Sequence, residues 1–134
     1  MNKEILQAER IKIYAEFMVD FYKGIGQSVL ARRKGIKNAN DRFIMEWARK
    51  IREFNAKCSM IASDDVVRGL IEYDKIGRDA MLSQDMPAVL GQFARIAMMM
   101  RKDLNPETKV TAEEILRTIV VDLDKHPELL QSLK

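Results

Sequence analysis

The sequence predicts an all-α protein, because apolar residues recur at helical spacing and no strand pattern is present. A seam of large apolar residues follows intervals of three and four: Ile44, Trp47, Ile51, Phe54, Cys58 and Ile61. With 3.6 residues per turn, this spacing keeps all six side chains on one face of a helix. No alternating run of β-branched residues lies between turn residues. We therefore expect long helices that bury one face against each other.

Acidic and basic residues four positions apart mark the solvated faces of the predicted helices. Such pairs stabilise a helix by only a few tenths of a kcal/mol each, so their value here is diagnostic. The predicted pairs are Glu46–Lys50, Glu53–Lys57, Asp64–Arg68, Asp74–Arg78 and Glu113–Arg117.

The first two helices are predicted to be long and antiparallel. The first spans residues 2–34, and its apolar residues Ile13, Phe17, Phe21, Ile25 and Val29 stand at intervals of four. Gly24 and Gly26 interrupt it, and each marks a kink, a break or a close approach of another helix. Gly35 suits the end of this helix, while Asn38 or Asn40 suits the start of the next.

Two shorter helices follow. Ser63 is a favoured N-cap, and the third helix runs over residues 64–81. The fourth begins within residues 84–87 and ends at Asn105, which we expect in the left-handed conformation before Pro106.

A helical segment completes the chain. Thr111 and Glu114 have the spacing of a capping box, and a last short helix starts at Pro127. The predicted fold is therefore a bundle of four main helices plus a short C-terminal helical segment. We expect residues 1–104 to form the bundle domain and residues 105–134 to form an extension packed on it.

Length and composition predict a single soluble domain in the cytoplasm. A chain of 134 residues is long enough for one core of ordinary size. No apolar run resembles a signal peptide or approaches the ~20 residues of a membrane span. The single cysteine, Cys58, cannot form an internal disulfide, which fits a reducing compartment.

The residues that catalysis or metal binding requires are sparse. His126 is the only histidine, and no two carboxylates stand three positions apart. This excludes the Glu-x-x-His pairs of di-iron bundles and disfavours helical hydrolases that hold magnesium through acidic pairs. We therefore expect no catalytic residue, no metal site and no cofactor, and a protein that is not an enzyme.

Two clusters have both a structural and a functional interpretation. Arg32, Arg33, Lys34 and Lys37 form a basic patch that either stabilises the end of the first helix or binds phosphate groups. Met98, Met99 and Met100 point in three directions about 100° apart, so a single core contact cannot bury all three. Met98 and Met99 are therefore candidates either for internal packing or for a contact between chains.

Two short segments carry a resemblance to known proteins. Residues 62–67 (ASDDVV) resemble an A-S-D-E-V-hydrophobic helix start, and residues 100–104 (MRKDL) resemble an M-R-K-D-L helix end. Both belong to a widespread group of uncharacterised helical proteins from bacteria and their phages, and the similarity covers residues 10–104. The group has a glycine where this chain has Asn105. The resemblance implies a helical bundle in which the ends of two helices matter, and no activity.

The matching segments suggest a contact between helix ends. Arg101 or Lys102 is expected to reach Ser63, Asp64 or Asp65 and lock the termini together, or to share a partner site with them. Asp103 belongs to the same candidate set, and an enzyme would need a pocket that gathers these acidic and basic groups.

The preferred functional prediction is a non-enzymatic interaction module that self-associates, as a homo-oligomer or with another protein. The alternative is an accessory or regulatory protein that associates with nucleic acid through the basic patch.

Overall fold

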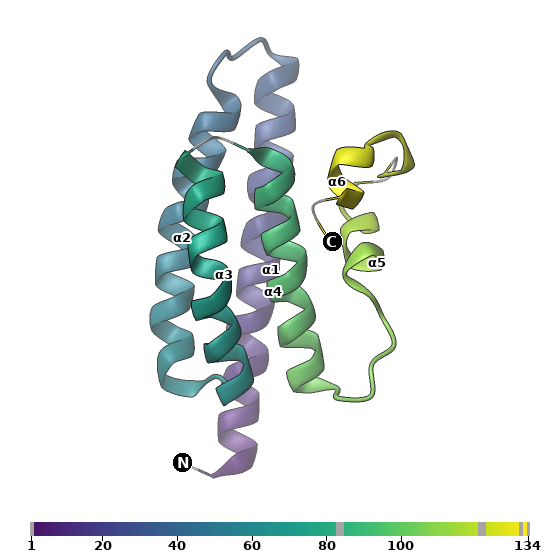
Figure 1. Ribbon diagram of the computed structural model, residues 1–134. Coiled ribbons are helices and arrows are strands. Elements are labelled where there is room, and N and C mark those ends of the chain that lie inside the picture. Colours follow the sequence, from purple (N-terminus) through teal and green to yellow (C-terminus); the bar gives the residue numbers. More distant parts are fainter. Residues whose placement is uncertain (1, 83–84, 121–122, 132, 134) are drawn as a thin grey trace. The chain divides into compact units, whose positions relative to one another are not determined.

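The computed structural model describes residues 2–82, 85–120, 123–131 and 133, and it confirms the all-α prediction, with no strand among them. Its contacts divide the chain into two compact units, residues 1–62 and residues 63–134. The helices are α1 (Lys3–Arg33), α2 (Ala39–Ile61), α3 (Asp64–Leu82), α4 (Met86–Leu104), α5 (Ala112–Arg117), a 3₁₀ helix η1 (Leu123–Lys125) and α6 (Pro127–Gln131) (Figure 1).

The boundary between the units lies between α2 and α3, whereas the sequence placed a division near residue 104. The segment predicted as a C-terminal extension belongs to the second unit, where α5 and α6 both contact α4. A single bundle domain over residues 1–104 stays a prediction. None of the described helices has the length and apolar character that crossing a membrane requires.

The first unit is an antiparallel pair of long helices joined by aromatic side chains (Figure 1). The ring of Phe17 lies 4.0 Å from that of Phe54 and 5.1 Å from that of Trp47, measured between centroids. Phe21 contacts Trp47 at 4.8 Å and Phe43 at 5.7 Å. Such pairs contribute about 0.5–1.5 kcal/mol beyond the area that they bury. We call this contact the aromatic seam.

The seam uses a different face of α1 from the one that the interval of four suggests. Tyr14, Phe17, Phe21 and Ser28 are buried, whereas Ile13 and Ile25 are only half-buried. Steps of four advance about 40° too far at 100° per residue, so a series of them winds around the helix. The side chain of Val29, the last member of the predicted series, lies outside the described residues.

Both glycines lie inside α1, which continues through them. A Cβ at Gly24 would lie 3.0 Å from Cε2 of Phe43, so Gly24 is where α2 approaches closely. A Cβ at Gly26 would meet nothing within 4 Å. The helix turn that follows contains Gly35, whose φ of 78° lies in the left-handed region that glycine tolerates.

Polar contacts join the same two helices along their edges. Nε of Arg10 donates to the carbonyl of Ile61 at 2.5 Å, which satisfies an acceptor at the end of α2. Lys50 and Lys57 extend to α1, where each ammonium lies 3.6 Å from a carboxylate, of Asp20 and of Glu16. Arg49 bonds both glutamates of the predicted pairs Glu46–Lys50 and Glu53–Lys57 on the solvated face of α2, while the two lysines extend to α1.

The second unit is organised around α4. Helix α3 packs against α4 as an antiparallel partner, and α5 and α6 contact it too. Gly69 of α3 permits the close approach, since a Cβ there would lie 1.8 Å from Sδ of Met99. The fully buried core side chains include Val66, Val89, Phe93, Leu116 and Leu123.

Capping residues fix most of the helix ends in this unit. Oγ of Ser63 accepts from the Val66 N–H at 3.4 Å, and Asp85, which the sequence analysis did not identify, accepts from the Ala88 N–H at 3.2 Å. Thr111 and Glu114 form the predicted capping box. The predicted Asp74–Arg78 and Glu113–Arg117 pairs form, and Arg117 also bonds Asp124 at 2.8 Å. That bond holds the pKa of the Asp124 carboxyl below its ordinary value.

The end of α4 differs from the expectation. Asn105 has φ −141° and ψ 88°, an extended conformation and not a left-handed one. Its N–H bonds the Arg101 carbonyl, and its side-chain oxygen accepts from the Glu107 N–H at 3.3 Å. The asparagine turns the chain with its side chain, so left-handed backbone is not needed.

Substitutions at the two glycines of α1 are predicted to have opposite effects. Gly26→Ala raises the free energy of unfolding by about 0.5–1 kcal/mol, because alanine favours the helix and meets no neighbour. Gly24→Ala gains the same propensity but crowds the Phe43 ring. In urea unfolding we expect the Gly24→Ala variant to be at least about 1 kcal/mol less stable than Gly26→Ala. Equal stabilities of the two variants would contradict the close approach of α2 at Gly24.

Gly69→Ala is predicted to destabilise the contact between α3 and α4 by about 1 kcal/mol, since the flexible Met99 side chain must shift to make room for the methyl group. A double-mutant cycle with Met99→Ala measures the cause. The Gly69→Ala penalty should shrink by at least about half in the Met99→Ala background. An unchanged penalty would show that the two side chains do not meet.

Candidate functional site

A second apolar face runs along α1, away from the seam residues. Five large apolar side chains of this helix are between 41% and 54% exposed: Ile5, Ile11, Val19, Tyr22 and Leu30. At 100° per residue they fall within an arc of about 120°, and the exposed small residues Ala8, Ala15 and Gly26 lie in the same arc. We call this surface the outer face of α1. Among the side chains that the structure describes, the other strongly exposed apolar residues, such as Met60 and Ile71, are not gathered in such a stripe.

Charge is distributed unevenly along the same helix. Residues 3–20 contain four acidic and three basic side chains, whereas residues 21–34 contain four basic ones and no acidic one. By the same angles, Glu4 and Lys12 lie within this arc in the first half and Arg33 in the second, while Lys23 lies at its edge and Glu16 just beyond it. The two halves of the face therefore differ in charge.

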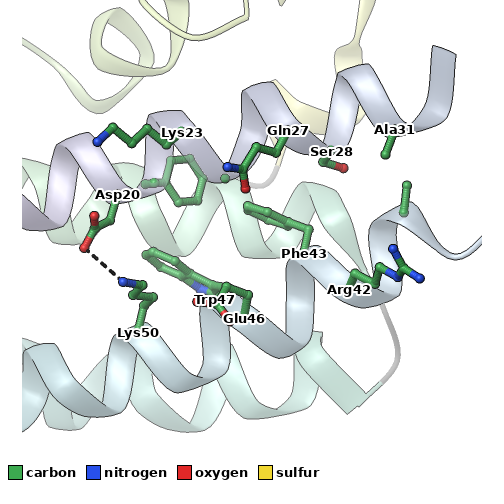
Figure 2. A pocket seen from close by; sticks show the side chains of 13 residues that line it. Asp20, Lys23, Gln27, Ser28, Ala31, Arg42, Phe43, Glu46, Trp47 and Lys50 are labelled. Atoms are coloured by element: carbon green, nitrogen blue, oxygen red, sulfur yellow. Dashed lines mark ion pairs between the residues drawn. The ribbon is translucent and has the colours of Figure 1, made fainter. Parts of the chain in front are cut away.

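A groove of about 540 Å³ lies between α1 and α2 near the turn that joins them (Figure 2). Three aromatic side chains of the seam, Phe21, Phe43 and Trp47, line it beside Gly24. The absence of a side chain at Gly24 leaves the Phe43 ring next to the backbone of α1. The remaining lining residues are Asp20, Lys23, Gln27, Ser28, Ala31, Ala39, Arg42, Glu46 and Lys50. The lining thus combines three aromatic side chains with seven polar or charged ones.

The two ends of the groove differ in electrostatic character. At one end Asp20 and Lys50 pair at 3.6 Å; at the other end lie Ser28 and Arg42 (Figure 2). The hydrogen bond from Arg49 holds the pKa of the Glu46 carboxyl below its ordinary value, so this group is ionised and already bonded. Within the described part of the chain, neither Lys23 nor Arg42 has an ion pair. The groove thus retains positive charge.

The candidate lock between helix ends lies in the second unit. Asp64 and Asp65 begin α3, and Arg101, Lys102 and Asp103 end α4. Nε of Arg101 donates to Oγ1 of Thr108 at 2.8 Å, so this side chain turns toward the loop after α4. Ser63 caps its own helix. Asp64, Asp65 and Lys102 are exposed, Asp103 is half-buried, and the lock stays a prediction.

The basic patch lies where α1 ends and the turn begins. Arg33, Lys34 and Lys37 are exposed there, while the side chain of Arg32 lies outside the described residues. The structure therefore presents three of the four predicted cations to solvent.

The methionine cluster has one internal contact. Met100 is buried, Met98 and Met99 are half-buried, and Met99 packs over Gly69 of the same chain. Of the two candidates for a contact between chains, Met99 already has a partner in α3. Cys58 is fully buried, and Nδ1 of His126 lies 3.4 Å from the Glu128 carboxylate.

Neither the outer face nor the groove was predicted from the sequence. The outer face has a signal: Ala8, Ala15 and Tyr22 stand seven apart, offset from the buried Tyr14, Phe17 and Phe21. The groove has none, because it depends on which α1 residues face Arg42 and Phe43 across the helix pair.

Among the described residues, no three histidine, cysteine or carboxylate side chains come together as a metal site would require. Comparisons with protein-family models, with curated proteins and with solved structures gave no match for this chain.

Proposed function

We propose that this protein is a non-enzymatic interaction module that self-associates through the outer face of α1. The observation that supports this most strongly is the stripe of half-exposed Ile5, Ile11, Val19, Tyr22 and Leu30 on a helix whose opposite side is buried in the seam. A helix that is apolar on both sides is expected to be covered on both. Exposed apolar side chains gathered on one face of a helix support an interaction site there.

The size of the face indicates a reversible dimer. A helix of 31 residues is about 46 Å long and about 10 Å wide, which gives a strip of roughly 450 Å² on each copy. Two such strips bury less than the ~1,200 Å² at which stable interfaces begin. We therefore expect a dissociation constant on the order of micromolar or weaker.

A second copy of this chain fits the face because its charges are self-complementary in an antiparallel arrangement. A two-fold axis near Val19 would bring Glu4 to the partner's Arg33 and Glu16 to the partner's Lys23. A parallel arrangement would instead place the basic residues 21–34 of both copies side by side. The small residues Ala8, Ala15 and Gly26 allow the two backbones to approach closely.

The double variant Ile11→Lys/Val19→Lys tests this proposal. Light scattering after size exclusion, repeated over a dilution series, should show wild-type protein shifting from dimer to monomer. The double variant should remain monomeric, because two desolvated ammonium groups oppose association. Ile71→Lys, which replaces a 71%-exposed isoleucine of α3, is the matched control and should dimerise like wild type. A wild-type monomer at every concentration, or equal loss in both variants, contradicts the proposal.

A nucleic-acid partner is the second candidate function, supported by the exposed Arg33, Lys34 and Lys37. Binding to phosphates would weaken steeply as salt rises. Labelled DNA and RNA that show no shift at low salt would remove this candidate. A shift lost in Lys34→Gln/Lys37→Gln would favour it over the dimer.

A further inference from the structure

We propose that the groove between α1 and α2 binds an amphipathic monoanion, a carboxylate with an apolar body. The groove shares Lys23 with the edge of the outer face of α1, but the residues proposed to hold the anion, Ser28 and Arg42, lie outside that face.

The apolar body fits the aromatic wall of the groove. Phe21, Phe43 and Trp47 line it with 6% or less of each residue exposed, and all three belong to the aromatic seam. Gly24 keeps the α1 side open, since any side chain there would meet the Phe43 ring. The wall is therefore held in place before a ligand arrives, which lowers the cost of binding.

Ser28 is the observation that points to a polar ligand. Its side chain is 6% exposed and lines the groove, yet its hydroxyl has no hydrogen-bond partner among the described atoms. A buried hydroxyl normally has one, because leaving it unsatisfied costs free energy. A ligand oxygen in the groove would accept its hydrogen bond.

The charge at this end of the groove selects an anion. The guanidinium of Arg42 lies at the Ser28 end (Figure 2) and has no ion pair within the described residues. The N-terminus of α2 is at the same end, where Ala39 lines the groove, and Asn38 makes no side-chain cap. The first-turn N–H groups and the guanidinium both favour negative charge. Asp41 is also in this first turn but does not line the groove.

The charges at the Asp20 end of the groove limit the ligand to a single negative charge. The carboxylate of Asp20 is paired with Lys50 there, and Glu46 is held by Arg49. The groove is lined by three cations and two carboxylates, an excess of one positive charge. A carboxylate at Arg42 with an uncharged body directed toward Trp47 matches this distribution.

The test uses decanoate as the probe and Trp47 as the reporter. Trp47 is the only tryptophan of the chain and lines the groove, so its emission is expected to change when a ligand binds there. Titration of the full-length protein below the micelle concentration should give a saturable change that fits one site per chain. Acetate, which lacks the body, and decyltrimethylammonium, which reverses the charge, should give no saturable change. Equal binding of decanoate and the cationic amphiphile would overturn the proposal.

Variants locate the anion. Arg42→Gln should weaken decanoate binding at least about tenfold, because a charge-assisted bond is lost, and Ser28→Ala should weaken it about threefold. Arg52→Gln, an exposed arginine of α2 outside the groove, is the matched control and should bind like wild type. Circular dichroism checks that each variant folds. If a variant does not fold, the emission titration of the wild-type protein still tests the proposal. Equal affinities of Arg42→Gln and Arg52→Gln would overturn the proposal.

A final arm separates a free carboxylate from a membrane lipid of the same charge. Vesicles of phosphatidylglycerol should not sediment the protein. Cosedimentation that Arg42→Gln abolishes would overturn the assignment to a free ligand. A protein that binds decanoate but never dimerises would contradict the proposed self-association and leave this site intact.

Discussion

The aromatic seam between α1 and α2 is the contact on which the proposed surfaces depend. Phe17, Phe21, Trp47 and Phe54 interlock at centroid distances between 4.0 and 5.1 Å, which fixes the rotation of α1 about its own axis. With that rotation set, Val19 and Tyr22 are exposed, and Gly24 and Ser28 line the groove. A rotation of one residue, about 100°, would remove both surfaces. The hydrogen bond from Arg10 to the Ile61 carbonyl adds a directional contact between the two helices, whereas the partly exposed ion pairs of Lys50 and Lys57 contribute little stability.

Helix α1 contrasts with α2 in how it divides its residues between core and solvent. Helix α2 has one buried stripe, from Ala39 to Cys58, and a charged opposite face. Helix α1 has exposed apolar residues on the side away from its buried face. In the proposed dimer, the uneven charge of α1 would favour a two-fold arrangement, since its acidic and basic halves would then attract each other. The groove has a different origin: Gly24 has no side chain, which leaves space beside the Phe43 ring.

The sequence predicted the fold class, the order of helices and several helix ends correctly, because those features are local. The buried stripe of α2 was predicted from the spacing of its apolar residues, and Thr111 and Glu114 form the predicted capping box. The buried face of α1 was only partly predicted. Because this helix has apolar residues on two faces, a series at intervals of four, from Ile13 to Val29, is regular in sequence but does not stay on one face of the helix. Lys50 and Lys57 form ion pairs with carboxylates of α1, and spacing within one helix cannot reveal contacts to another helix. Ser28 and Arg42 have no pattern in common and become neighbours only across the helix pair.

The account depends most on the claim that two copies meet antiparallel along α1. A single cysteine placed at Val19 or at Leu30, in a Cys58→Ala background, measures this directly under mild oxidation. Cysteines at position 19 should cross-link rapidly, because a two-fold axis near this residue brings them together. Those at position 30 should not, since antiparallel copies hold them about 33 Å apart. Rapid cross-linking at position 30, or at neither position, would contradict the account.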